Sequence, residues 1–298
     1  MDMWIGLPSV NVPEAVLEEN NTEIDPLYQN IYSAFSCNTQ IIEDNLLLPR
    51  ACGKESEEIA AVTIKSLFKN YAEAKFAKVL IDCRSSAAIG GPAPSYKLGA
   101  KTGLTSILPF SLSGQAGTEA VQALIFSRHI QQIGMAGGII STVQKMVQPD
   151  SRLKTNGYPL ADAAASVFIS GTQDMTGLWF KLLSVTIKQL TQDWETALKS
   201  MVDEVLSQAG LTIQKVQWVV SHRFSNLFLN SVQKILPKSS HLVRDIYPEF
   251  DFGCVDSFIS LNRIFHKEYP NPNEIGLLSF AGRFGTVGAI LLEPQERS

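Results

Sequence analysis

Apolar runs that suit buried strands alternate along the chain with amphipathic stretches that suit helices. Apolar residues fall at helical spacing over 57–76, and the Val-Leu-Ile run within 77–85 is typical of a buried strand. A short apolar strand over 107–113 then leads through a turn of small residues into a helix over about 117–132. Further strands are predicted over 134–140 and 165–170.

The alternation restarts in the second part of the chain. A strand over 181–187 precedes an amphipathic helix over 192–209, which Gly210 ends. The remaining predicted elements are a strand at 216–222, helices at 225–236 (with Ser225 or Asn226 as N-cap) and 254–265, and closing strands at 275–282 and 286–293. This pattern predicts an α/β fold of two βα halves, 1–170 and 171–298, that share one core.

Two segments depart from the alternation. Residues 85–103 are rich in Gly, Pro and Ser, which predicts a surface loop. The first fifty residues show no regular period and predict no definite element.

The turn at 282–285 suits a hairpin with a slightly long loop between the two closing strands.

Composition narrows the classes of function. Of the 298 residues, 45% are apolar and 18% are charged, with a net charge of −4, and no run of Lys and Arg indicates nucleic-acid binding. No apolar run approaches the roughly 18 residues of a membrane span, and the N-terminus has no signal-peptide pattern, so we expect a cytoplasmic protein. The four cysteines, Cys37, Cys52, Cys83 and Cys254, show no metal-ligand spacing. We therefore predict reduced thiols, no metal and no cofactor.

Four segments, in this order, resemble a known family. They are 108–130, 160–170, 218–226 and 277–293. Together they resemble β-ketoacyl-acyl carrier protein synthase III and its relatives, which are condensing enzymes of the thiolase fold. The resemblance covers most of the chain from about residue 55 onward. It implies a layered αβαβα core and substrates carried on coenzyme A or an acyl carrier protein.

The resemblance also implies where the catalytic residues of the family should lie. In the family, the nucleophilic Cys lies at the start of the helix that follows the strand of the first segment. The corresponding residue here is Gly117. The family's His falls on His222, and its Asn falls on Phe252, or on Asp251 or Gly253 after a slip of one residue. In the family, the Cys takes an acyl group as a thioester while the His and Asn stabilise a developing enolate. Of these three residues only the His is retained.

Other parts of the motifs match unevenly. The family's Gly-Asp-Gly-Ala strand corresponds to 161–164, where both glycines are replaced by alanine. The closing hairpin keeps Gly282, whereas Arg283 and Phe284 depart from the pattern. Without a thiolate, ping-pong condensation at this site is not possible.

Three further side chains are candidates for chemistry near this site. Ser113 is a candidate nucleophile, although a hydrogen-bonded residue at a strand end is the simpler interpretation. Glu119 is a candidate base, but a Glu in a first helical turn is favoured by the helix dipole alone. Cys254 lies at the start of a predicted helix, where a thiol is polarised, although a buried structural cysteine is the simpler interpretation.

Two hypotheses of different classes follow. The first is a non-catalytic subunit that pairs with a Cys-bearing ketosynthase III-like chain in fatty-acyl or secondary-metabolite biosynthesis. Residues 108–113 would be an unprotected apolar edge in a monomer, which favours a partner. The second is a stand-alone acyltransferase or thioester hydrolase with His222 as base. A homodimeric acyl-binding protein is a third interpretation.

Overall fold

The structure, a computed structural model, covers most of the chain. It describes residues 2–18, 39–41, 46–85, 93–114, 117–134, 137–145, 153–155, 158–172, 177–190, 193–237, 240–243, 250–267, 270–282 and 285–297.

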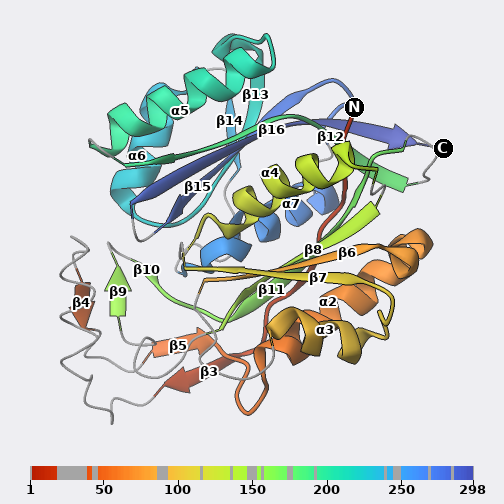
Figure 1. Ribbon diagram of the computed structural model, residues 1–298. Coiled ribbons are helices and arrows are strands. Elements are labelled where there is room, and N and C mark those ends of the chain that lie inside the picture. Colours follow the sequence, from red (N-terminus) through yellow and green to blue (C-terminus); the bar gives the residue numbers. More distant parts are fainter. Residues whose placement is uncertain are drawn as a thin grey trace.

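A mixed eleven-stranded sheet forms the centre of the molecule (Figure 1). Its strands follow the order β14-β13-β15-β16-β12-β1-β11-β8-β6-β7, and β2 also pairs with β11. The bounds are β1 Trp4–Gly6, β2 Ser9–Asn11, β6 Val79–Arg84, β7 Leu108–Ser113, β8 Gly137–Gln144, β11 Ala163–Ser170, β12 Gly177–Gln189, β13 Val216–Ser221, β14 His241–Val243, β15 Ile275–Gly282 and β16 Thr286–Arg297. Small sheets are formed by β3 Ala15–Glu18 with β5 Leu46–Pro49, and by β4 Thr39–Ile41, β9 Leu153–Thr155 and β10 Tyr158–Pro159.

The order of elements repeats along the chain. The first series is β1-α2-β6-α3-β7-α4-β8-β11, and the second is β12-α5-β13-α6-β14-α7-β15-β16. The helices are α2 Ser56–Asn70, α3 Pro94–Thr102, α4 Glu119–Gln132, α5 Trp194–Gln208, α6 Asn226–Ile235 and α7 Asp256–Lys267. Corresponding strands pair in the same directions, because β6 is parallel to β7 and β8 just as β13 is parallel to β14 and β15. β11 is antiparallel to β1 and β8, as β16 is to β12 and β15. This repeat supports dividing the chain at 170/171, which stays a proposal.

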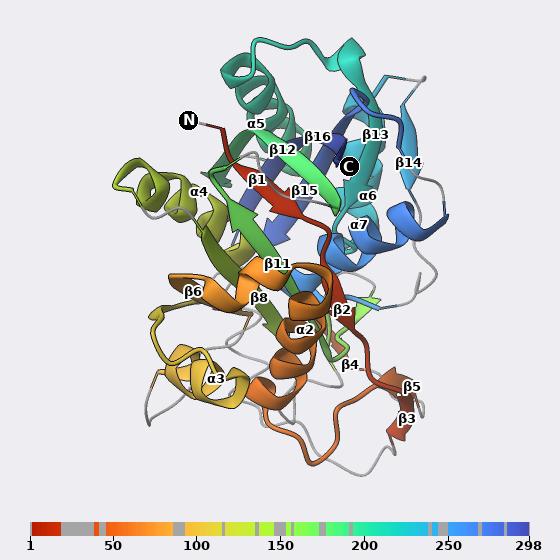
Figure 2. The ribbon, with the colours of Figure 1, turned by 90° about the vertical axis from the view of Figure 1, so that its right-hand side faces the viewer.

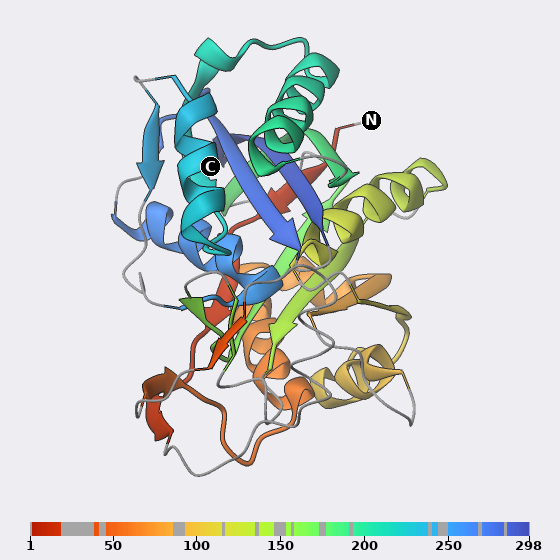
Figure 3. The same cartoon turned by 90° about the vertical axis from the view of Figure 1, so that its left-hand side faces the viewer.

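Helices lie in three layers around the two parts of the sheet. The apolar faces of α4 and α7 meet both series of strands in one central core. α2 and α3 cover the outer face of the first series, and α5 and α6 cover that of the second. Figure 3 shows α2 and α3, in orange and yellow, at one end of the molecule and the two teal helices at the other. The layered αβαβα arrangement is the one that the sequence predicted.

Helix signals in the second half were accurate. α5 begins after Asp193, whose side chain accepts a hydrogen bond from the Thr196 N–H, and ends before Gly210, which has φ +66°. Of the two N-cap candidates for α6, Ser225 fills the position and accepts a hydrogen bond from the Phe228 N–H. Strand lengths were less accurate, since the segment predicted at 134–140 is β8 and reaches Gln144 through buried polar residues.

The prediction of a surface loop over 85–103 was wrong for its second part. α3 lies there, with Pro94 at its first turn and Gly103 in the left-handed conformation at its end. Proline at the start and glycine just past the end are ordinary helix boundaries, so the loop-like composition came from the caps. The predicted helix over 57–76 also divides, because α2 ends at Asn70 and a 3-10 helix occupies Ala72–Phe76.

The first fifty residues supply the strand that joins the two series. β1 lies between β11 and β12 and pairs antiparallel with both (Figure 2). Its short sequence, Trp-Ile-Gly, is buried on both faces and carries no alternating pattern, so nothing in its local sequence predicted a strand.

Cysteine placement partly matches the expectation of buried thiols. Cys83 and Cys254 are buried and free, whereas Cys52 is free but exposed, and Cys37 lies outside the described residues. None of the helices in the described residues has the length and apolar character that crossing a membrane requires.

Tyr71 ties β1 to β12 and generates the first prediction. Its hydroxyl accepts a hydrogen bond from the Leu7 N–H at 2.6 Å and donates one to the Leu178 carbonyl at 2.7 Å. Tyr71→Phe should lower the free energy of unfolding by about 1–2 kcal/mol, because it leaves buried backbone groups less well satisfied. Urea denaturation measures this change. Tyr96→Phe, at a tyrosine that is 64% exposed, is the matched control and should change little.

Candidate functional site

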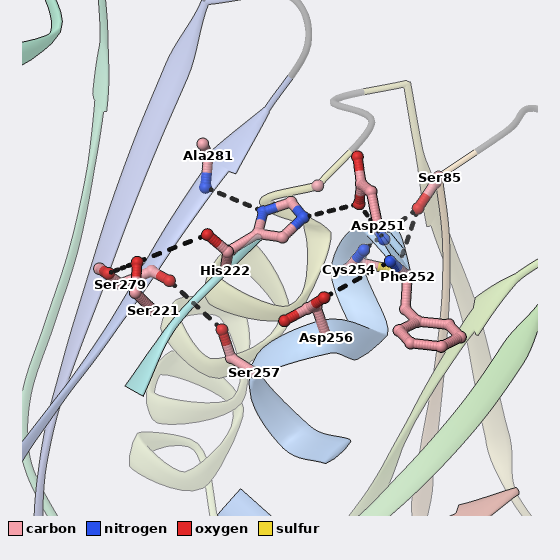
Figure 4. Close-up of polar contacts among 12 residues, drawn as sticks. Ser85, Ser221, His222, Asp251, Phe252, Cys254, Asp256, Ser257, Ser279 and Ala281 are labelled. Atoms are coloured by element: carbon pink, nitrogen blue, oxygen red, sulfur yellow. Dashed lines mark hydrogen bonds and ion pairs between the residues drawn. The ribbon is translucent and has the colours of Figure 1, made fainter. Parts of the chain in front are cut away.

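His222 lies at the centre of the retained motifs, just after β13. Its backbone N–H donates to the Ser279 carbonyl of β15 at 2.9 Å, which fixes the loop against the neighbouring strand. The imidazole is completely buried. Nε2 lies 2.9 Å from Asp251 Oδ1, and the Ala281 N–H donates to Nδ1 at 3.3 Å (Figure 4). Both ring nitrogens therefore have partners.

The residue that faces His222 is Asp251. Its backbone is held by a bridge to Leu160, and its Oδ1 also accepts a hydrogen bond from the Gly253 N–H at 2.6 Å. The neighbouring Phe252 points its ring away from the imidazole and is completely buried (Figure 4). The side chain beside the imidazole is therefore that of Asp251, one of the two positions to which an alignment shift of one residue would move the family's Asn.

The two contacts of His222 determine its tautomer. Because an N–H points at Nδ1, that nitrogen presents its lone pair, and the proton resides on Nε2, which donates it to Asp251. Burial lowers the pKa of His222, but the charge of Asp251 and the hydrogen bond to it raise this pKa, and the balance places it above the ordinary value.

A metal ion fits this arrangement poorly. Ligand atoms of His222, Asp251 and Asp256 lie within 4.8 Å of one another, and all three residues are buried. For Nε2 to bind a metal, however, Nδ1 would have to carry the ring proton, directly opposite the Ala281 N–H. Histidine ligands normally donate that second proton to an acceptor. The donor set therefore favours a hydrogen-bonded His–Asp pair.

Gly117 stands where the family's nucleophile is expected, and its surroundings leave no room for a side chain. Its φ is +147°, and an added Cβ would overlap the carbonyl oxygen of Ala281 and come within 3.2 Å of Gly282 Cα. The turn therefore packs directly on the end of β15, at a backbone conformation that residues other than glycine rarely adopt. Gly282, buried at the end of β15, forms the other side of this contact.

Glu119 holds the same turn. Its side chain is completely buried, and Oε2 accepts a hydrogen bond from the Gly117 N–H at 2.8 Å. A carboxylate at this position satisfies an N–H ahead of α4 and complements the positive end of the helix dipole. This contact accounts for Glu119 without a role as a base.

Cys254 and Ser113 lie in unlike surroundings. The Cys254 thiol is completely buried, and burial, followed by the charge of Glu119, raises its pKa far above the ordinary value. Its Sγ accepts a hydrogen bond from Ser85 Oγ at 3.4 Å, and as a neutral thiol it is a poor nucleophile. Ser113 is the exposed last residue of β7.

Sequence reasoning missed the contact through which the first series reaches this site. Gly253 has φ +55° and packs against Gln144 Oε1 and Ser85 Oγ. A Cβ added to Gly253 would lie 2.5 Å from each of these oxygens. Ser85 follows β6 and Gln144 ends β8, so both lie at the carboxyl ends of neighbouring parallel strands. A glycine beside a predicted helix start was the one local sign of this close approach.

Comparison with known proteins gives the fold. No model of a known family matches the chain, and no curated protein matches it significantly. Among solved structures, the acyltransferase ChlB3 matches with a TM-score of 0.76 and 15% identity, over 99% of this chain and 98% of that one. 3-Oxoacyl-(acyl carrier protein) synthase III, FabH, from Pseudomonas aeruginosa PAO1 matches with a TM-score of 0.72, 16% identity and 98% of each chain. OleA from Xanthomonas campestris matches with a TM-score of 0.71, 12% identity and 98% of each chain.

The chain therefore has the thiolase-like fold of the ketosynthase III-type condensing enzymes, which confirms the predicted fold class. At these identities the likeness establishes the fold.

The packing of Gly117 predicts that a nucleophile cannot be restored by one substitution. Gly117→Cys should lower the free energy of unfolding by several kcal/mol, because its Cβ meets backbone atoms that have no room to move. Urea denaturation measures the change, and iodoacetamide labelling reports whether the new thiol is reachable. Gly114→Ala is the control, since that position also has positive φ but has no atom within 4 Å. Equal losses in the two variants would show that backbone strain alone acts.

The His222 pair predicts a pH-dependent stability. The pKa of His222 is higher in the folded chain than the unfolded value of 6.5, so its contribution to stability is complete below that value. It is lost as pH rises through the folded pKa. His222→Gln should therefore cost more stability at pH 6 than at pH 9, measured by urea denaturation across this range. His129→Gln, at an exposed histidine, should leave the pH profile of the wild type unchanged.

Proposed function

We propose that this chain is the non-catalytic member of a ketosynthase III-like pair, and that it supports the fold and acyl pocket of a Cys-bearing partner. The observation that carries the proposal is the packing of Gly117 on the Ala281 carbonyl. A nucleophile at this turn would need the space that the end of β15 occupies. The site is therefore better suited to joining elements than to accepting an acyl group.

The hydrogen bonds of His222 weigh against a stand-alone hydrolase or acyltransferase. A general base needs one ring nitrogen within reach of the proton it removes. Here Nε2 contacts Asp251, Nδ1 accepts from the Ala281 N–H, and the ring is completely buried. A substrate hydroxyl would have to displace a backbone donor to reach Nδ1. The alternative with His222 as base is therefore the second candidate.

The edge strand β7 supports pairing with another chain. Among the strands that the structure describes, β7 pairs with β6 alone, so its other side presents backbone groups at the border of the large sheet. Unlike the neighbouring β6 and β8, it has exposed and half-buried residues along its whole length, with Leu108 45% exposed. Phe110 packs edge-on against Phe126 of α4, with ring centroids 4.8 Å apart. An apolar edge of this kind favours strand addition by a partner.

The nature of the partner and substrates follows from the same proposal. A Cys-bearing ketosynthase III-like chain would supply the nucleophile, and acyl groups on coenzyme A or an acyl carrier protein would be its substrates, in the cytoplasm. The structural neighbours include FabH at 16% identity and AbyA1 at 12%, described as a tetronic acid condensing enzyme, so the proposal covers fatty-acyl or secondary-metabolite biosynthesis. A homodimer formed through the same strand is the alternative assembly.

Labelling and co-purification test this function together. The chain alone should take up no label from radiolabelled acyl-CoA at the turn of Gly117, because no nucleophile stands there, whereas a co-expressed Cys-bearing chain should be labelled and should co-elute with it on size exclusion. Leu108→Lys should abolish co-elution by placing a charge on the edge strand. Val62→Lys, at an exposed aliphatic residue of α2, is the matched control and should preserve it.

Two results would contradict the proposal. One is turnover of a thioester by the chain alone that His222→Ala abolishes, which would establish the second candidate. The other is a monomeric chain that no Cys-bearing homologue captures.

A further inference from the structure

A row of polar residues crosses the first series of strands beneath α2 and α3. Ser9 of β2 pairs in register with Ser166 of β11, and Ser166 pairs with Ser141 of β8. Ser141 pairs with Asp82 of β6, and Asp82 with Ser111 of β7. Four of the five are buried, and Ser111 lies on the exposed edge strand.

Strand alternation places this row on the face that α2 covers. Leu80 and Ile139, two residues before Asp82 and Ser141, belong to the core under α2, whereas Ile81 and Ile140 face the central helices. Thr63 of α2 reaches down to the row, with its Oγ1 2.6 Å from Ser166 Oγ. A continuous polar row under a helix is unusual, because this face of a sheet is ordinarily apolar.

Hydrogen-bond accounting leaves acceptors in the middle of the row. Thr63 Oγ1 donates its hydrogen to the Ala60 carbonyl at 2.7 Å, so the hydrogen between Thr63 and Ser166 comes from Ser166. Ser141 Oγ and Asp82 Oδ1 are buried and have no hydrogen-bond partner among the described residues. Two acceptors, Ser166 Oγ and Asp82 Oδ1, therefore flank a single hydroxyl that donates one hydrogen.

The charges around Asp82 do not balance. Arg84 Nε contacts Asp82 Oδ2 at 2.6 Å, and its Nη2 lies 3.3 Å from Glu57 Oε1. Two buried carboxylates thus share one guanidinium, which leaves one negative charge in a region closed to solvent. An uncompensated buried charge is costly, so this region favours a positive species. Burial raises the pKa of Asp82 to about 6 despite the opposing effect of Arg84, in line with this imbalance.

We propose that a monovalent cation binds between β6 and β8 under α2, with Asp82 Oδ1, Ser141 Oγ and Ser166 Oγ as its protein ligands. Carboxylate and hydroxyl oxygens suit a hard cation such as Na⁺ or K⁺. Asp82 and Glu57 carry two negative charges and Arg84 carries one positive charge. A monovalent cation would bring the sum to zero, whereas a divalent cation would leave a net positive charge. The site lies on the opposite face of the sheet from His222 and is independent of the proposed pairing.

Thermal unfolding at constant ionic strength tests the site. Replacing choline chloride by NaCl or KCl at pH 8 should raise the melting temperature saturably, by about 2–4 °C. The rise should shrink at pH 5, where protonation of Asp82 competes with the ion. Ser141→Ala should raise the half-saturating concentration several-fold, and Asp82→Asn should abolish the response.

A matched variant and a direct readout make the test decisive. Ser127→Ala removes a buried hydroxyl of α4 that donates to the Ala123 carbonyl, and it should keep the full response. ²³Na line broadening should appear with the wild type and with Ser127→Ala, and it should weaken in Ser141→Ala even if Asp82→Asn fails to fold. Equal melting temperatures in choline, Na⁺ and K⁺, without line broadening, would overturn the proposal and assign the row to water. A response that Ser127→Ala weakens as much as Ser141→Ala would overturn it too.

Discussion

The backbone of Ala281 is the point on which the candidate site depends. Its carbonyl packs against Gly117 at the start of the central helix α4, and its N–H donates to the imidazole of His222. His222 in turn contacts Asp251, whose carboxylate accepts a hydrogen bond from the turn before α7. Both central helices and the end of β15 therefore meet at the backbone of one residue. Moving any of these elements would break a contact between buried polar groups, which is costly without replacement by water.

This dependence suits the proposed function, in which the fold of a condensing enzyme is kept without its catalytic residues. Acyl transfer requires space at the nucleophile and an accessible ring nitrogen. Here the space at Gly117 is filled by the end of β15, and both ring nitrogens of His222 are in hydrogen bonds within the chain. The fold is retained at 12–16% identity to the structural neighbours, because its layers depend on apolar periodicity and short connections, which many sequences satisfy.

Periodicity predicted an α/β fold and most helices, since α4, α5 and α6 have apolar faces, whereas the layering followed from the family resemblance. His222, which its motif singled out, contacts Asp251 and the Ala281 N–H, and its role stays a prediction. Three features could not be predicted for physical reasons. β1 is too short to show a period, α3 resembled a loop because its caps are Pro and Gly, and Asp251 meets His222 through a bridge to Leu160 that is distant in sequence. Contacts between elements that are far apart in the chain leave no local pattern.

The position of β1 has a consequence for how the chain folds during synthesis. Trp4 pairs with Ser170 on one side and with Lys181 on the other, so β1 leaves the ribosome before its partners, which are made about 170 residues later. Closing so long a loop is entropically slow, and the central sheet stays open along that line until then. Until β11 and β12 emerge, both edges of β1 lack their partners. Chaperone capture of nascent chains should therefore be concentrated in this interval of elongation.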